Sequence, residues 1–195
     1  MSQRVIQVTG VLFLLFLIFF MEYKPYEQHN QINSTTTQQI FSLYFFISNQ
    51  ALGIVHEAGH GVCYILNCPK FLTALNGTFF QLLFPLFVAL HYKYHDNKLG
   101  YYIGLFFVGF SLHYTSWYIS TAHITSVVKA NQSFLGVDGY HDFHYILKTL
   151  GLLSYDTIIA GFTKFIATMM MFYSVLRMLF FGFVSDSKKE NIKPK

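Results

Sequence analysis

The sequence predicts an all-α membrane protein, a polytopic bundle of about five transmembrane helices formed by a single domain, residues 1–195. Hydrophobic residues make up 53% of the chain and only 11% are charged, against roughly 25% in globular domains. Apolar stretches near the length of a membrane span, about 20 residues, recur along the chain. We therefore expect a multi-pass integral membrane protein, with membrane lipid as a partner.

The first two apolar stretches are residues 5–21 and 40–66, and a polar loop, residues 23–39, separates them. Arg4 before the first stretch is typical of a signal peptide. However, no small-residue cleavage site follows, so we expect a retained anchor rather than a cleaved leader.

The third stretch, residues 71–90, contains residues that commonly interrupt helices. Asn76 and Gly77 lie near its start, and Pro85 lies near its end. Proline has no N–H for the carbonyl four residues earlier, so we expect a break or kink here. An irregular segment of this kind can pair with an extended substrate, although a kinked packing helix explains the pattern equally well.

The fourth stretch, residues 99–128, is apolar at first and then rich in Ser, Thr and His. We expect this polar half to face other helices or a water-filled cavity, because lipid disfavours it. The last stretch, residues 150–184, contains the final span and is followed by a short basic tail, residues 185–195. The lysines of this tail favour a cytoplasmic C-terminus, and no basic pattern indicates nucleic-acid binding.

Two cysteines, Cys63 and Cys68, lie five residues apart. Two cysteines cannot form a disulfide framework, and their spacing matches no standard zinc pattern. We interpret them as two thiols in or near a membrane helix.

One motif carries chemistry, the HEAGH sequence that begins with His56 and Glu57 and ends with His60. Histidines four residues apart share a helix face and can bind one zinc ion. The glutamate can act as a general base toward a water whose pKa zinc lowers to about 7. Glu57 is the one formal charge of its stretch, and a charge inside a membrane costs roughly 2.5–3.5 kcal/mol, which favours a functional role over a polar cluster that only joins helices.

A hydrolytic zinc site needs a third protein ligand and an open position for water. The leading candidates are His141 and Asp142, of which one binds the metal and the other orients a ligand or substrate, while Asp138 is a further candidate. Asp142 is alternatively a helix N-cap. His113 and His123, ten residues apart, share roughly one helix face and are possible additional ligands, although packing explains each of them more simply.

The chain resembles a group of small, uncharacterised bacterial multi-pass proteins with an HEAGH motif that are described as candidate zinc metalloproteases. The resemblance covers residues 47–153 and rests on four segments in order: HEAGH at 56–60, LNGTFFQLLFP at 75–85, GFSL at 109–112 and GYHDF at 139–143. More distantly, this group is similar to site-2-protease-like intramembrane metallopeptidases.

The resemblance implies zinc-dependent cleavage of peptide bonds within the membrane. The HExxH motif of the site-2 family maps to residues 56–60, and its third ligand, an Asp of an Asp-Gly pair, would map to Asp138. The recurring GYHD segment of the closer group instead ranks His141 and Asp142 first. That group often has an Asp near position 123, where this chain has His123.

The sequence thus predicts an intramembrane zinc metallopeptidase with Glu57 as the general base and a membrane protein or peptide as substrate. One alternative is a membrane metal-handling or transport protein, which needs no general base. Another is a di-iron lipid-modifying enzyme, which the nine histidines allow but the lack of an adjacent His-His pair opposes.

Overall fold

The computed structural model describes residues 3–22, 36–123 and 141–190, and every regular element within these ranges is a helix. The elements are, in chain order, α1 (Gln3–Glu22), α2 (Thr36–Ile65), α3 (Lys70–Tyr94), α4 (Lys98–Ser120), α5 (Asp142–Thr149), the 3-10 turn η3 (Leu153–Tyr155) and α6 (Asp156–Glu190). The predicted all-α class is confirmed for the described residues. Asp138 lies outside them.

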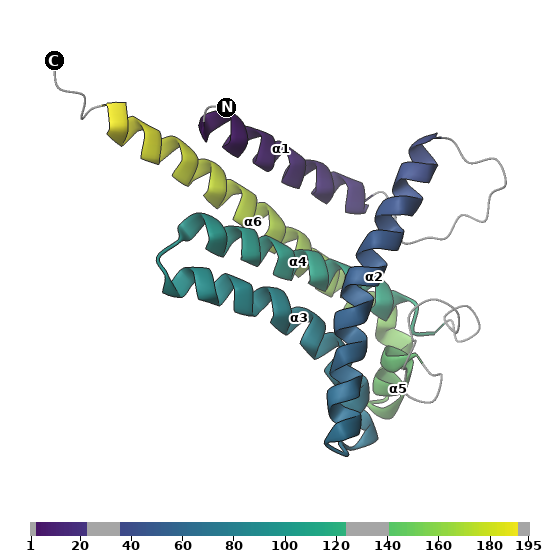
Figure 1. Ribbon diagram of the computed structural model, residues 1–195. Coiled ribbons are helices and arrows are strands. Elements are labelled where there is room, and N and C mark those ends of the chain that lie inside the picture. Colours follow the sequence, from purple (N-terminus) through teal and green to yellow (C-terminus); the bar gives the residue numbers. More distant parts are fainter. Residues whose placement is uncertain (1–2, 23–35, 124–140, 191–195) are drawn as a thin grey trace.

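The long helices form a bundle that one helix crosses. In Figure 1, α1, α3, α4 and α6 run along a common direction, whereas α2 lies across it. α4 packs against both α3 and α6, α2 packs against α3, and α5 also contacts α3. α4 is therefore the central helix, and α3 joins the central helix to the two elements that carry the HEAGH and GYHD motifs.

Small residues let α4 approach its neighbours closely. A Cβ added to Gly104 would lie 2.7 Å from the Cα of Ala89 on α3. A Cβ on Gly109 would lie 2.8 Å from Met171 on α6. Close contacts of this kind through small residues are common where helices pack in membranes.

The polar half of α4 is buried, as the sequence predicts. Ser111, His113, Thr115 and Ser116 are all less than 5% exposed. Two of the hydroxyl groups form hydrogen bonds within α4 itself. Thr115 donates to the carbonyl of Ser111 at 3.0 Å, and Ser116 donates to the carbonyl of His113 at 2.6 Å. Neighbouring helices therefore shield this segment from the surroundings of the bundle.

α3 continues through the positions where the sequence predicts a break. The Asn76 amide donates to the Gly59 carbonyl of α2 at 2.6 Å. Pro85 lies inside the helix and leaves the Gln81 carbonyl without its usual N–H donor. The Ser111 hydroxyl of α4 supplies that donor at 3.1 Å, so the helix tolerates the proline.

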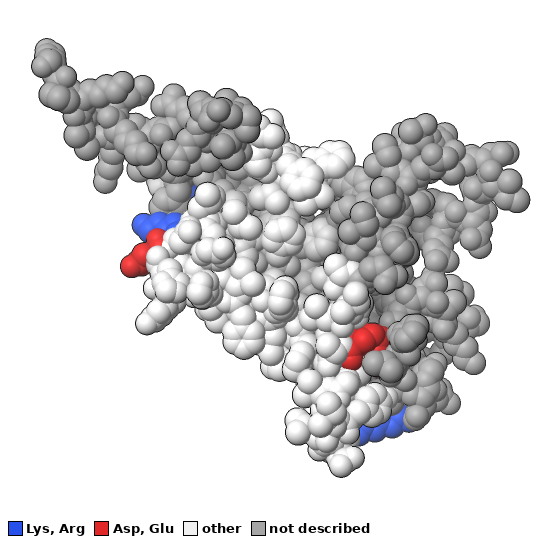
Figure 2. Space-filling view, in the orientation of Figure 1, with Lys and Arg blue, Asp and Glu red and all other residues white. Residues whose placement is uncertain are grey.

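Two described helices are long and apolar enough to cross a membrane, residues 70–94 and 153–180, and α1 contains a shorter apolar segment, residues 8–19. The predicted five spans are therefore not confirmed. Large apolar side chains are nevertheless exposed on α3 and α6, among them Phe84 and Phe162. Figure 2 shows one face of the molecule on which the described residues are almost all uncharged.

Two predicted polar segments are shorter than expected. α2 begins at Thr36, inside the predicted loop of residues 23–39, and residues 23–35 lie outside the described residues. α6 continues to Glu190, inside the predicted basic tail of residues 185–195. Gln, Lys and Glu are good helix formers, so a helix can extend beyond the apolar stretch that reveals it.

The prediction of two separate thiols is wrong, because Cys63 and Cys68 form a disulfide with a Cα–Cα distance of 5.0 Å. α2 ends in a Schellman motif, in which Asn67 has a φ of 52° and the N–H of Cys68 donates to the carbonyl of Cys63 at 2.9 Å. This motif brings residues five apart into contact.

We predict that Phe106→Ala lowers the free energy of unfolding by roughly 3 kcal/mol, since the Phe106 side chain is fully buried among α1, α4 and α6. Phe107→Ala is the matched control, because the neighbouring Phe107 is 42% exposed. Thermal unfolding of the detergent-purified protein measures both. Equal losses would contradict the described core.

Candidate metal centre

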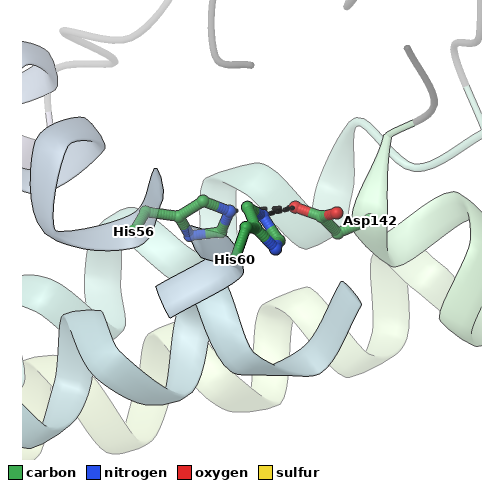
Figure 3. A group of neighbouring side chains, drawn as sticks. All are labelled: His56, His60 and Asp142. Atoms are coloured by element: carbon green, nitrogen blue, oxygen red, sulfur yellow. Dashed lines mark hydrogen bonds and ion pairs between the residues drawn. The ribbon is translucent and has the colours of Figure 1, made fainter. Parts of the chain in front are cut away.

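Three ligand-type side chains from distant parts of the sequence meet at one point. His56 and His60 come from one face of α2, and Asp142 comes from the first turn of α5 (Figure 3). Their ligand atoms all lie within 4.8 Å of one another, and all three residues are buried. Within the described part of the chain, this is the group of His, Cys, Asp and Glu side chains able to hold a metal ion.

The distances between these atoms suit a small cation. Asp142 Oδ2 lies 2.9 Å from His56 Nε2 and 3.2 Å from His60 Nε2. Tetrahedral ligands at the zinc–nitrogen distance of 2.0–2.1 Å are about 3.3 Å apart. The separations of Asp142 Oδ2 from the two imidazoles therefore match those between ligands of one tetrahedral ion.

Hydrogen bonds at the other ring nitrogens determine which atoms face the centre. His60 Nδ1 donates to the Thr73 carbonyl at 2.7 Å, and His56 Nδ1 lies 3.3 Å from Gln81 Oε1. A carbonyl oxygen can only accept, so these Nδ1 atoms carry the hydrogens, and in the neutral rings both Nε2 atoms have lone pairs. Two lone pairs then face a carboxylate oxygen, an arrangement that a bound cation stabilises.

Asp142 is held as an ionised ligand. Burial by itself would raise the pKa of its carboxyl. When His56 and His60 are protonated at Nε2 and donate to Asp142, their contacts outweigh burial and lower the pKa to about 2. When both rings are neutral, a bound cation would take their place as the positive partner of the carboxylate. The Tyr118 hydroxyl donates to Asp142 Oδ2 at 3.2 Å. Asp142 Oδ1 is buried and has no hydrogen-bond partner within the described residues, so the carboxylate retains capacity for a further ligand.

Gly77 of α3 provides space beside the two imidazoles. A Cβ at this position would lie 2.6 Å from His56 Nε2 and 2.7 Å from His60 Nε2. Any side chain here would therefore occupy the region onto which both ligand atoms open. The three donor atoms and this space together fit a metal ion.

Glu57 follows His56 on α2 and is 8% exposed. Its charge interacts with the His60 imidazole. The general base predicted from the sequence is therefore buried on the helix that carries both histidines.

The structure does not bring His141 into this group. Its Nδ1 accepts from the backbone N–H of His144 and caps α5, its Nε2 lies 3.1 Å from the Thr121 hydroxyl, and its ring stacks on Tyr118 at 4.0 Å. Burial lowers the pKa of His141 to about 4, so this side chain is neutral at pH 7. His141 is therefore the N-cap of α5. The sequence allowed this role for Asp142 as an alternative to metal binding.

His113 and His123, the two additional candidates, also lie outside the group of His56, His60 and Asp142. His113 is buried within α4. His123 bonds to the Asp156 carboxylate at the start of α6 through both its backbone N–H, at 3.1 Å, and its Nδ1. Neither belongs to the ligand group of the described residues.

Sequence reasoning missed Tyr118 and the Thr73 carbonyl. Tyr118 lies in a tyrosine-rich helix with no motif around it, and a backbone carbonyl leaves no signature in a sequence. Gly77 and Gln81 lie in the stretch where the sequence predicts a break, and the structure places both beside the two imidazoles on a continuous helix.

Comparisons with protein-family models, with curated proteins and with solved structures give no match to this chain. The resemblance to the HEAGH group therefore stays a prediction.

We predict that Gly77→Ala abolishes metal binding, because the new methyl group fills the space beside both Nε2 atoms. Gly61→Ala on α2 is the control, since a Cβ there meets nothing within 4 Å. Alanine favours a helix over glycine by roughly 1 kcal/mol, so neither substitution should weaken its helix intrinsically. Metal content by mass spectrometry distinguishes the two, and full metal content in Gly77→Ala would contradict the described geometry.

We also predict that Asp142→Asn weakens metal binding by more than about 100-fold, since losing even an outer partner of a ligand costs 10- to 100-fold. His141→Asn should bind metal nearly as well as the wild type, because Asn replaces the helix cap. Competition with a chromophoric chelator measures both affinities. The reverse order of effects would assign the third ligand to His141.

Proposed function

We propose that this chain is a multi-pass intramembrane metallopeptidase that uses zinc to hydrolyse peptide bonds. The observation that carries the proposal is the buried group of His56, His60 and Asp142 with Glu57 beside it on the same helix. Two histidines, one carboxylate and an open position are typical of catalytic rather than structural zinc sites.

The surface of the bundle supports its place in a membrane. Phenylalanines such as Phe87 on α3 and Phe165 on α6 are at least 60% exposed, a pattern that lipid favours and water does not. α4 carries buried polar side chains in its second half, and α3 and α6 cover this helix. A helix enclosed by others can carry the buried polar groups that a lipid-facing helix cannot.

The chemistry follows from the positions of the side chains. When bound, zinc polarises a peptide carbonyl and makes a water acidic, with a pKa of about 7. Glu57 accepts the proton of the attacking water and passes it to the amine as the carbon–nitrogen bond breaks. His56, His60 and Asp142 would hold the metal, and a substrate helix must unwind locally to expose its amide.

A further buried oxygen supports the presence of a polar ligand near this centre. Thr78 follows Gly77 on α3, and its hydroxyl has no hydrogen-bond partner within the described residues. Buried polar groups are nearly always paired, so this hydroxyl favours an additional partner such as water or a substrate amide.

We predict that Glu57→Gln keeps zinc but lowers peptide hydrolysis by at least about 100-fold, the usual contribution of a general base. The assay measures cleavage of a quenched fluorescent transmembrane peptide in detergent, together with metal content. Hydrolysis at the wild-type rate in Glu57→Gln would overturn the mechanism. Readily exchangeable metal without hydrolysis would favour a metal-handling protein, and bound iron would favour the di-iron alternative.

A further inference from the structure

A chain of buried hydrogen bonds connects Pro85 to the metal centre. Because Pro85 has no N–H, the Gln81 carbonyl four residues earlier is free to accept from another helix. The Ser111 hydroxyl of α4 donates to that carbonyl at 3.1 Å. Both Gln81 and Ser111 are at most 3% exposed, so water does not compete for these bonds.

The same two residues also bond through the Gln81 side chain. Gln81 Nε2 donates to the Ser111 hydroxyl oxygen at 3.1 Å and to the Ser111 carbonyl at 3.3 Å. The Ser111 hydroxyl already gives its hydrogen to the Gln81 carbonyl, so its oxygen can only accept from the amide. These bonds point the amide nitrogen toward α4 and leave Oε1 facing His56.

The direction of this amide decides the state of His56. Oε1 is an acceptor, so His56 Nδ1 must donate to it across 3.3 Å. The neutral ring then carries its lone pair on Nε2, the atom that faces His60 and Asp142. A reversed amide would present hydrogens to Nδ1 and move the ring hydrogen to Nε2, where it would block a metal.

We propose that Gln81 is a positioning residue for the metal centre, and that Pro85 and Ser111 serve to fix the direction of its side chain. The inference rests on the proposed metal site and adds three residues that do not touch the metal. A proline and a buried amide weaken a membrane helix. The need to orient His56 explains why Pro85 and the Gln81 amide occur within α3.

The first test separates positioning from packing. Pro85→Ala supplies an N–H that can bond the Gln81 carbonyl within α3 and displace the Ser111 hydroxyl. We expect a higher midpoint of thermal unfolding for the metal-free protein but a zinc affinity lower by several-fold. A residue with a purely structural role would shift both quantities in the same direction.

The second test changes Gln81 itself. Gln81→Met keeps the volume and removes the acceptor, so zinc affinity should fall roughly 10- to 100-fold, as for other partners of metal-bound histidines. Gln81→Glu keeps an acceptor facing His56 and should restore most of the affinity. The visible absorption spectrum of the cobalt-loaded protein should change in Gln81→Met and return toward that of the wild type in Gln81→Glu.

Ser116→Ala is the matched control. Ser116 is as buried as Gln81, but its hydroxyl bonds only to the His113 carbonyl of its own helix among the contacts described, so zinc affinity and the cobalt spectrum should not change.

Unchanged affinity and spectrum in Gln81→Met would overturn the proposal. Unchanged affinity in Pro85→Ala alongside a loss in Gln81→Met would overturn the role of Pro85. A wild-type protein that binds neither zinc nor cobalt would instead overturn the metal centre itself.

Discussion

The close contact between α2 and α3 at Gly59 is the constraint on which the candidate site depends. A Cβ on Gly59 would lie 2.4 Å from the Asn76 carbonyl oxygen, so no larger residue fits without moving a helix. The Asn76 amide donates to the Gly59 carbonyl at 2.6 Å and fixes the register of the two helices. The glycine of the HEAGH motif thus serves the contact between helices, while the residues around it serve chemistry.

This register brings the two imidazoles against α3 in a defined way. His60 meets the Thr73 carbonyl three residues before Asn76, and His56 meets Gln81 five residues after it. Both partners are oxygen acceptors, so both rings present the same nitrogen, Nε2, to Asp142. One helix therefore supplies the ligands, and its neighbour determines their tautomers and leaves space beside them.

Asp142 depends on a different part of the bundle. The Tyr118 hydroxyl of α4 accepts from the Asp142 backbone N–H and donates to its carboxylate. The Tyr118 ring also stacks on His141, which caps the helix that Asp142 begins. The third ligand is thus positioned by the central helix, which links both halves of the site through Ser111 and Tyr118.

The sequence predicts what is local and leaves open what depends on packing. Long apolar stretches predict the long helices. They do not predict the ends of these helices, such as the start of α2 at Thr36, where polar residues continue the helical hydrogen bonds. The spacing of His56 and His60 predicts their shared face. The sequence does not decide between His141 and Asp142, because both are metal-ligand types. Which of the two reaches the histidines of α2 depends on how the first turn of α5 packs against α4.

The disulfide in the Schellman turn after α2 bears on the redox surroundings of the candidate site. Disulfides persist in oxidising surroundings and are reduced by cytosolic thiols. In the proposed membrane bundle, a bond between Cys63 and Cys68 therefore favours a non-cytoplasmic position for the turn that joins α2 and α3. His60 is three residues before this bond, so in the proposed bundle the redox state of the turn would report which face of the membrane is nearest the candidate metal site.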